Sequence, residues 1–353
     1  MFLTGGGVFV ELSDRKLKIL AAVINNYIQF AEPVSSKVLC ELLDFSVSSA
    51  TIRNELAELT ELGLLEQPHT SAGRVPSHVG YRLYINQLMG KAYLPRKTKE
   101  YIDSALNLSV KEPEVLLKNA TSLLASMTNF AVVSTDVSAQ KSCVKSIKLV
   151  QVSSFAAMLI LTTSSGIIKN RLFRCENLLT DEVLDKFNGV LNEKFAGVSI
   201  ADITPALIQT VAVSLGPLAF LMSDVFDALF EVARSISKPD LHIDGQTNLL
   251  LVPEFNQQVA VRLINFFAGF EDIDDLFFST GEDRTRVFIG EESNREELAH
   301  SSIVVTRYMV NGENCGSIGV VGPTRMNYAK LIARLEYIAD LLGEILNDLF
   351  RVE

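Results

Sequence analysis

Apolar residues recur at helical spacing through the first ninety residues, where they divide into short segments. One segment follows Ser13, has its apolar residues between Leu17 and Ile28 and ends at Glu32-Pro33, and two shorter ones cover residues 36–43 and 48–62. Steps of three and four residues between apolar positions are typical of helices with one buried face. Residues 64–76 follow, and they contain the Gly, Ser and Pro residues that are typical of a turn. The pattern therefore predicts three helices followed by a hairpin.

The third of these helices has the pattern of a helix that reads DNA. Ile52, Leu56 and Leu59 share one face, which predicts that this face packs inward. The opposite face is small or polar near its start, and arginine and asparagine there suit the guanine and adenine edges of the major groove. Either of two serines can cap the helix. The residues expected to contact DNA are Ser48, Ser49, Thr51, Arg53 and Asn54.

The hairpin tip offers groups that suit phosphate oxygens. A helix-turn-helix followed by such a hairpin is the winged-helix way of holding duplex DNA. The amide of Gly73 and the charge of Arg74 can both reach a phosphate. The expected contacts from this wing are His69, Ser71, Gly73 and Arg74. The competing interpretation is an ordinary helical hairpin with a solvated loop, and Glu55, Glu58 and Glu61 favour it because carboxylates repel phosphate.

Later in the chain the period changes from helix to strand and back. Six short runs rich in β-branched and aliphatic residues predict strands, at residues 146–151, 156–162, 167–173, 286–290, 303–310 and 316–321. Helical patterns separate and close them, at residues 99–106, 114–128, 181–193 and 327–350. Short turns between consecutive strands require antiparallel pairing. We expect an α+β domain with a single sheet covered by helices on one face.

Between the two groups of strands lies a mainly helical block, residues 199–283, with more apolar surface than a solvated lobe would carry. We expect this block to be an inserted dimerisation domain, although it could instead bury itself against the sheet. The predicted organisation is a DNA-binding domain at 1–90, a linker at 91–104, a split domain at 105–198 and 284–353, and the insertion at 199–283.

The charge of the chain is unevenly distributed. The formal net charge is −10, which argues against non-specific binding of nucleic acid by the whole surface. Residues 68–98 nevertheless contain no Asp or Glu, and cations run from Arg74 to Lys99. This asymmetry fits one DNA-facing side. The uncharged runs at 149–168 and 203–223 contain turn residues or prolines, so we interpret them as core or interface, not as membrane spans.

No motif predicts catalysis. The sequence has no Walker A, GxSxG or HExxH pattern, and its four cysteines and four histidines lack zinc spacing. The Gly322–Arg325 turn could receive an anion, but a cap with a packing arginine is the favoured interpretation. We expect no enzyme activity, no metal, no cofactor and a cytoplasmic, reduced environment.

Several stretches form a long and unusual combined motif. They are PVSS at 33–36, SATIRNEL at 49–56, PHTSAGRVP at 68–76, GYR at 80–82, HIDG at 242–245, IGEE at 289–292 and the run at 316–328. Together they resemble the heat-inducible transcription repressor HrcA family, from about Leu12 to the end of the chain.

The resemblance implies a winged-helix domain, a GAF-like domain, and a dimerising domain inserted into the latter, with the HIDG motif in the insertion. It also implies a homodimer that binds the inverted-repeat operator CIRCE upstream of chaperone operons, with the chaperonin GroEL assisting the repressor into its active form. Two alternatives remain: a metabolite-gated repressor with an effector in the GAF-like domain, and a winged helix that binds protein instead of DNA.

Overall fold

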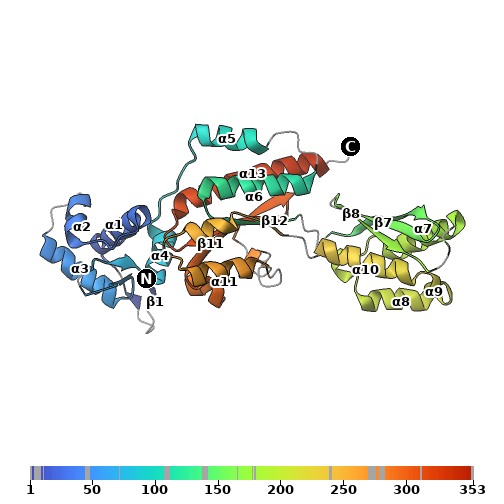
Figure 1. Ribbon diagram of the computed structural model, residues 1–353, viewed down its shortest axis with the longest axis horizontal. Coiled ribbons are helices and arrows are strands. Elements are labelled where there is room, and N and C mark those ends of the chain that lie inside the picture. The colour runs from blue at the N-terminus through green and yellow to red at the C-terminus, as the bar shows by residue number, and fades with distance from the viewer. Residues whose placement is uncertain are drawn as a thin grey trace.

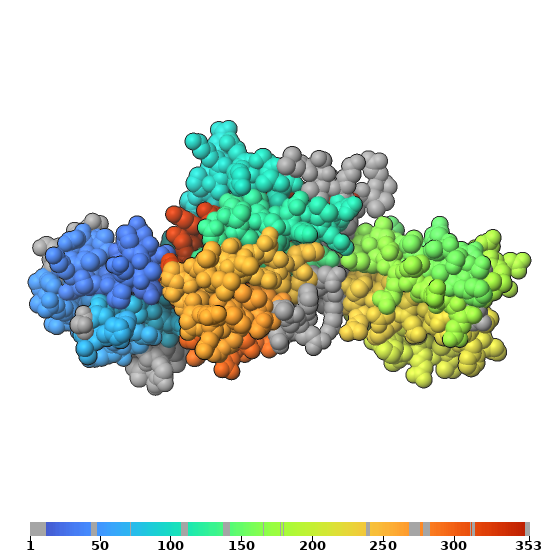
Figure 2. All heavy atoms as spheres, viewed as in Figure 1, coloured from blue at the N-terminus to red at the C-terminus, as the bar shows by residue number. Residues whose placement is uncertain are grey.

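The computed structural model describes residues 2–3, 9–10, 12–43, 48–70, 72–106, 112–136, 142–164, 166–176, 178, 180–237, 241–268, 276–277, 283–310 and 312–350. The described chain forms three lobes in a row, which Figures 1 and 2 show along the long axis. We call them the N-terminal lobe (residues 12–90), the central lobe (residues 96–136 and 241–350) and the distal lobe (residues 142–237). The short strands β1 (Phe2–Leu3) and β2 (Phe9–Val10) pair with each other ahead of them.

The N-terminal lobe contains the predicted helices and hairpin. Its elements are α1 (Asp14–Phe30), α2 (Ser36–Leu42), α3 (Ser49–Glu61), β3 (Leu65–Glu66), β4 (Val75–Pro76), α4 (His78–Leu83) and the π-helix η1 (Tyr84–Leu88). Ser13 caps α1 and Ser35 caps α2, each by accepting a backbone N–H with its side-chain oxygen. Gly63 follows α3 with φ of 72°, which is the left-handed conformation that ends helices. The turn at residues 44–47 lies outside the described residues.

A five-stranded antiparallel sheet organises the described part of the central lobe. Its strand order is β10 (Thr285–Ile289), β11 (Ser301–Val310), β12 (Glu313–Pro323), β5 (Ala131–Thr135) and β9 (Leu241–Asp244). The predicted strands at 286–290, 303–310 and 316–321 are confirmed. The sequence analysis missed β5 and β9, which complete the sheet.

Helices cover both faces of this sheet, as Figure 1 shows. On one face α6 (Pro113–Thr128) and α13 (Tyr328–Phe350) pack against strand residues such as Val132 and Val320, with α5 (Arg96–Leu106) outside them. On the other face a second core joins Val133 and Val305 to α11 (Gln257–Ala268) and to η3 (Gln246–Leu251). Short helical turns η5 (Gly290–Ser293) and η6 (Glu296–Leu298) link β10 to β11.

The distal lobe has its own sheet. Strands β6 (Val144–Ser153), β7 (Ala156–Thr163) and β8 (Ile168–Arg174) form an antiparallel meander, as their short turns predict. Its helices are α7 (Asp181–Phe195), η2 (Ile200–Asp202), α8 (Pro205–Leu215), α9 (Leu218–Leu221) and α10 (Ser223–Ser237). Helices α7 and α10 pack on one face of the sheet.

The prediction of a single sheet with helices on one face is therefore wrong. Among the described strands, those at 144–174 form a sheet only with one another, whereas β5 pairs with β12 and β9 pairs with β5. Placing the HIDG motif in the inserted block is also wrong, because Leu241–Asp244 pairs with Ala131–Thr135 in the central sheet. Local patterns fixed which segments are strands, but the choice of partner depends on contacts over a hundred residues apart.

The two uncharged runs are accounted for by the fold. Residues 149–168 belong to β6, β7 and the start of β8, and residues 203–223 belong to α8, α9 and their connections. Among the described residues no helix combines the length and the apolar character that crossing a membrane requires.

Candidate nucleic-acid interface

Helix α3 places polar side chains outward at its N-terminal end. The Ser48 hydroxyl accepts the backbone N–H of Thr51 at 3.1 Å and so caps the helix. Ile52, Leu56 and Leu59 are buried, as their spacing predicts. The side chains of Arg53 and Asn54 are exposed on the other face. These two residues are thus available to a ligand as large as a DNA duplex.

Other predicted residues of this helix are engaged within the lobe. The hydroxyls of Ser49 and Ser36 share a hydrogen bond of 3.0 Å, which joins α3 to α2. The Thr51 hydroxyl lies 2.9 Å from that of Ser48. Arg53 Nε donates to Ser36 Oγ at 3.4 Å, so the arginine leans toward α2 while staying exposed. Ser49 therefore orients the helix pair, which the sequence pattern did not reveal.

Two of the three carboxylates that argued against DNA binding, Glu55 and Glu58, are paired with cations of α1. Glu55 is buried, and Arg15 Nε donates to it at 2.7 Å while Lys16 Nζ lies 3.3 Å from its other oxygen. Lys16 also pairs with Glu58 at 2.8 Å. The hydrogen bond that the Lys16 ammonium donates to Glu58, with a smaller contribution from Glu55, raises the pKa of Lys16 above its usual value. Cations of α1 thus compensate two of the three acidic charges. Glu61 is exposed and forms no ion pair with a described residue.

The hairpin is fixed against the start of α2 by backbone contacts. Val34 and Arg74 exchange two backbone hydrogen bonds, each 2.9 Å long. A Cβ on Gly73 would lie 2.4 Å from the Val34 carbonyl oxygen, so only glycine allows this approach. Packing against Val34 therefore explains why residue 73 is a glycine, a reason that is separate from the predicted contact of its amide with phosphate.

The remaining wing residues differ in exposure. His69 is exposed, and Gln67 Nε2 donates to the carbonyls of Thr70 and Ala72 at 2.9 and 3.2 Å, which holds the tip. Arg74 is half-buried, and its Nε donates to the Thr60 hydroxyl at 2.9 Å. Ser71 lies outside the described residues. Sequence reasoning missed Gln67, which holds the hairpin tip, and Arg15, which pairs with Glu55, because no sequence pattern marks either residue.

The basic run after the wing does not form one continuous surface. Arg82 pairs with Glu292 and donates to the Val287 carbonyl at 2.6 Å, so it joins the N-terminal lobe to the central lobe. Arg96 pairs with Glu100 along α5. The ammonium of Lys99 lies 5.1 Å from the centre of the Tyr337 ring. The expectation that these cations all face DNA is therefore wrong.

The same junction contains close packing between the two lobes. The rings of Tyr81 and Tyr328 meet edge to face with centroids 6.0 Å apart. Burial raises the pKa of the Tyr81 hydroxyl well above its usual range. A Cβ on Gly290 would lie 2.3 Å from the His78 ring, and Gly290 has φ of 56°. The N-terminal lobe thus packs against β10 and η5, and this contact fixes the orientation of α3 relative to the central lobe.

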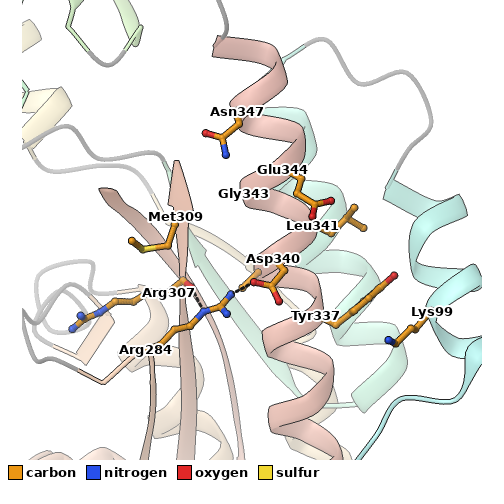
Figure 3. A pocket seen from close by; sticks show the side chains of 11 residues that line it. Lys99, Arg284, Arg307, Met309, Tyr337, Asp340, Leu341, Gly343, Glu344 and Asn347 are labelled. Atoms are coloured by element: carbon orange, nitrogen blue, oxygen red, sulfur yellow. Dashed lines mark hydrogen bonds and ion pairs between the residues drawn. The ribbon is translucent and has the colours of Figure 1, made fainter. Parts of the chain in front are cut away.

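The central lobe has a large open pocket that both cationic and anionic side chains line. Figure 3 shows this pocket of about 840 Å³ between α13 and the β11 edge, with Arg284 pointing toward Asp340. Arg284 also donates to the Arg307 carbonyl at 3.4 Å, and the Tyr337 hydroxyl donates to Asp103 at 2.7 Å. The hydrogen bond to Asp103 raises the pKa of Tyr337 to about 12. One ion pair and two hydrogen bonds thus join separate elements at this pocket.

No group of three or more His, Cys, Asp and Glu side chains in the described part of the chain could hold a metal ion. Arg325 forms an ion pair with Glu254, in line with the interpretation of its turn as a cap with a packing arginine. The second core of the central sheet is filled by Phe255, Phe266 and Phe267.

Comparisons with known proteins agree with one another. A family profile described as the HrcA protein C terminal domain matches residues 114–332. The heat-inducible transcription repressor HrcA of Ruminiclostridium cellulolyticum is 35% identical over 337 residues, which cover 94% of this chain and 97% of that protein. The corresponding repressor of Moorella thermoacetica is 34% identical and covers 97% and 100%.

One solved structure shares the fold. A crystal structure of a protein described only as hypothetical is 23% identical and covers 96% of this chain and 100% of its own, with a TM-score of 0.62. The mixed helix and sheet architecture and the full-length relatives define a transcription repressor. The chain belongs to the HrcA family of heat-inducible transcription repressors.

Proposed function

We propose that the N-terminal lobe is a winged-helix domain that reads an inverted-repeat operator with α3. The observation that carries this proposal is the arrangement of α3 itself. Exposed Arg53 and Asn54 lie in its first turns, while Glu55 behind them is buried against Arg15 and Lys16. N-terminal residues of a reading helix are the ones that reach base edges. Thr51, Ser48 and the wing residues His69, Ser71, Gly73 and Arg74 complete the proposed contact set.

The operator proposed here is the one that the family resemblance implies, the inverted repeat CIRCE upstream of chaperone operons. Two N-terminal lobes would occupy successive major grooves on one side of the duplex. The chaperonin GroEL would assist the repressor into its active form in the cytoplasm. When heat draws the chaperonin to unfolded proteins, repression would lapse and chaperone genes would be transcribed.

We propose that the distal lobe, residues 142–237, is the inserted dimerisation domain, in place of residues 199–283. The face of its sheet opposite α7 and α10 supports this. The pairing register aligns Val150, Met158 and Leu172 across this face, and Leu172 is 60% exposed. Apolar rows of this kind, exposed in one chain, are typical of surfaces buried between subunits. The central lobe would then be the GAF-like domain, split by this insertion.

A gel-shift experiment tests the DNA proposal. The full chain is titrated into an inverted-repeat duplex and into a scrambled duplex of equal length and composition at the same salt concentration, since salt changes both affinities. The proposal predicts retention of the inverted repeat at concentrations at least tenfold lower. Equal retention of both duplexes, or of neither, would instead favour a winged helix that binds protein.

The metabolite-gated alternative requires a cavity in the GAF-like domain. The apolar core on the α11 face of the described sheet contains packed phenylalanine side chains, and the pocket in Figure 3 contains the Arg284–Asp340 ion pair. The packed side chains argue against an effector buried on the α11 face of the sheet. A thermal-shift screen of metabolites, read on the full chain, separates the two routes.

A further inference from the structure

A second pocket lies at the joint between the N-terminal and central lobes. It has a volume of about 640 Å³. The N-terminal lobe contributes residues of α1 and Tyr84 of η1, and the central lobe contributes the end of α6, the turn after β12 and the first turns of α13. Pockets of roughly 300–1,000 Å³ are the size that small ligands occupy. A molecule held here would touch both lobes at once.

The charge of this pocket is opposite to that of the chain as a whole. Arg325, Lys330 and Arg334 line it, and no Asp or Glu is among its lining residues, whereas the chain carries a formal net charge of −10. Arg325 is paired with Glu254, and Arg334 Nη1 donates to the Met127 carbonyl at 3.1 Å. Lys330 is exposed, and its ammonium has no carboxylate partner within the described part of the chain. A concave site lined by one sign of charge concentrates ligands of the other sign.

The start of α13 adds to this positive field. The helix begins at Tyr328 and runs for 23 residues. The Asn327 side chain accepts the Lys330 backbone N–H at 3.2 Å, and the first-turn amides of an α-helix have no partner within the helix itself. Amides and the macrodipole at a helix N-terminus favour phosphate oxygens. The pocket thus combines the N-terminus of α13 with three cationic side chains. Arg325 lies in the turn after β12, and Lys330 and Arg334 lie on α13.

The other walls would suit the rest of an organic molecule. The apolar and aromatic lining comprises Ile28, Tyr84, Met127, Phe130, Met326 and Leu331. On the α1 side, Asn25 and Gln29 offer amide groups, and Asn25 Oδ1 already accepts the Tyr84 hydroxyl at 2.6 Å. Flat apolar walls beside amides and cations match a planar base attached to a phosphate group.

We propose that this pocket binds a phosphate-bearing small molecule of the nucleotide class. The phosphate lies against Lys330, Arg334 and the start of α13, and the base lies toward Tyr84 and Phe130. Because the ligand contacts α1 and α13 together, it stiffens the joint and shifts the population of N-terminal lobe orientations. The effect on operator affinity rests on the proposed function, but ligand binding itself does not.

Calorimetric titration of the full chain tests the proposal. ATP and AMP are the probes, adenosine is the control that lacks phosphate, and pyrophosphate is the control that lacks the base. We expect the nucleotides to bind and both controls to bind at least tenfold more weakly. Lys330→Gln is expected to weaken nucleotide binding at least tenfold, while Lys145→Gln, which removes an exposed lysine from the distal lobe, leaves it unchanged.

Three results would overturn the proposal. The first is that no nucleotide binds to a chain that still binds its operator. The second is that Lys330→Gln and Lys145→Gln weaken nucleotide binding equally. The third is that Lys330→Gln leaves both the nucleotide affinity and the melting temperature unchanged. If Lys330→Gln lowers affinity for duplex DNA and no nucleotide binds, the pocket serves the DNA backbone and the proposal is wrong. Nucleotide binding by a chain that fails to retain the inverted repeat would instead contradict the proposed function alone.

Discussion

Arg53 and Asn54 differ from the other predicted contact residues because nothing in their own lobe buries them. Ser49 and Thr51 share hydrogen bonds with serines of the same lobe, and Arg74 is half-buried against Thr60. Sequence pattern could identify which face of α3 points outward, because that depends only on helical spacing. It could not identify which polar groups are already hydrogen-bonded. The partners Ser36 and Thr60 lie thirteen and fourteen residues away from Ser49 and Arg74, and helical spacing says nothing about contacts between separate elements.

The contact between Arg74 and Thr60 allows two roles of the arginine to be separated. Arg74→Gln is expected to weaken binding to operator and scrambled DNA alike, and to reduce the slope of log affinity against log salt by about one, because one phosphate contact is lost. Thr60→Val removes the 2.9 Å hydrogen bond but keeps the charge. If the valine variant reproduces the change of slope, Arg74 acts by positioning the wing and not by touching phosphate.

The buried carboxylate of Glu55 is expected to stabilise the N-terminal lobe. Glu55→Ala leaves Arg15 and Lys16 without their shared partner, and removal of one side of a partly buried ion pair should lower the free energy of unfolding by about 1–3 kcal/mol. Urea unfolding of the full chain measures it. Glu61→Ala is the matched control, because Glu61 is exposed. Equal small effects of the two substitutions would show that the Glu55 pair contributes little.

At the scale of elements, short local signals decided what could be predicted. Caps, apolar spacing and Gly63 locate α1, α2 and α3, and turn residues locate β6, β7 and β8. The strands β5 and β9 are five and four residues long and have no flanking hairpin turn, so no local signal marks them. Their pairing with β12 and with each other depends on tertiary contacts, which the pattern of a single segment does not contain.

The wing provides a test of an element that depends on one glycine. Gly73→Ala places a Cβ against the Val34 backbone, so the hairpin must move away from α2. We expect operator affinity to fall by about tenfold, consistent with about 1–3 kcal/mol for overpacking a tight contact. Gly90→Ala is the control, because a Cβ there meets no atom within 4 Å. Unchanged affinity in Gly73→Ala would show that the wing position is not needed for binding.

At the scale of the whole molecule, buried apolar residues of all three lobes belong to one hydrophobic cluster, and polar contacts add further links between the lobes. Arg82 and Glu292 link the N-terminal and central lobes. Lys169 of the distal lobe lies 3.3 Å from Glu114 and 3.6 Å from Asp136 of the central lobe, and Asp136 also bonds His242 at 2.5 Å. The junction between the N-terminal and central lobes therefore combines the Arg82–Glu292 ion pair with the packing of Tyr81 against Tyr328.

The open sheet face of the distal lobe makes a prediction about assembly. Leu172→Lys puts a charge in the middle of the apolar row, so we expect the full chain to sediment as a monomer and to lose cooperative binding to the inverted repeat. Phe220→Lys changes a more exposed apolar residue, on α9 of the same lobe, and should leave the dimer intact. If only the Phe220 variant dissociates, the interface lies on the helical side of the lobe.

The central claim is that Arg53 and Asn54 of α3 read operator bases, and a thermodynamic cycle tests it most directly. Fluorescence anisotropy gives the affinity of the wild type, Arg53→Ala and Asn54→Ala for the inverted repeat and for duplexes with each half-site base pair replaced in turn. The account predicts that each alanine substitution lowers the free energy of binding to the intact operator by about 1–3 kcal/mol. It also predicts that the same substitution has no effect on binding to the duplex in which the guanine or adenine read by that residue has been replaced. Losses of equal size on every duplex, including a scrambled one, would contradict it.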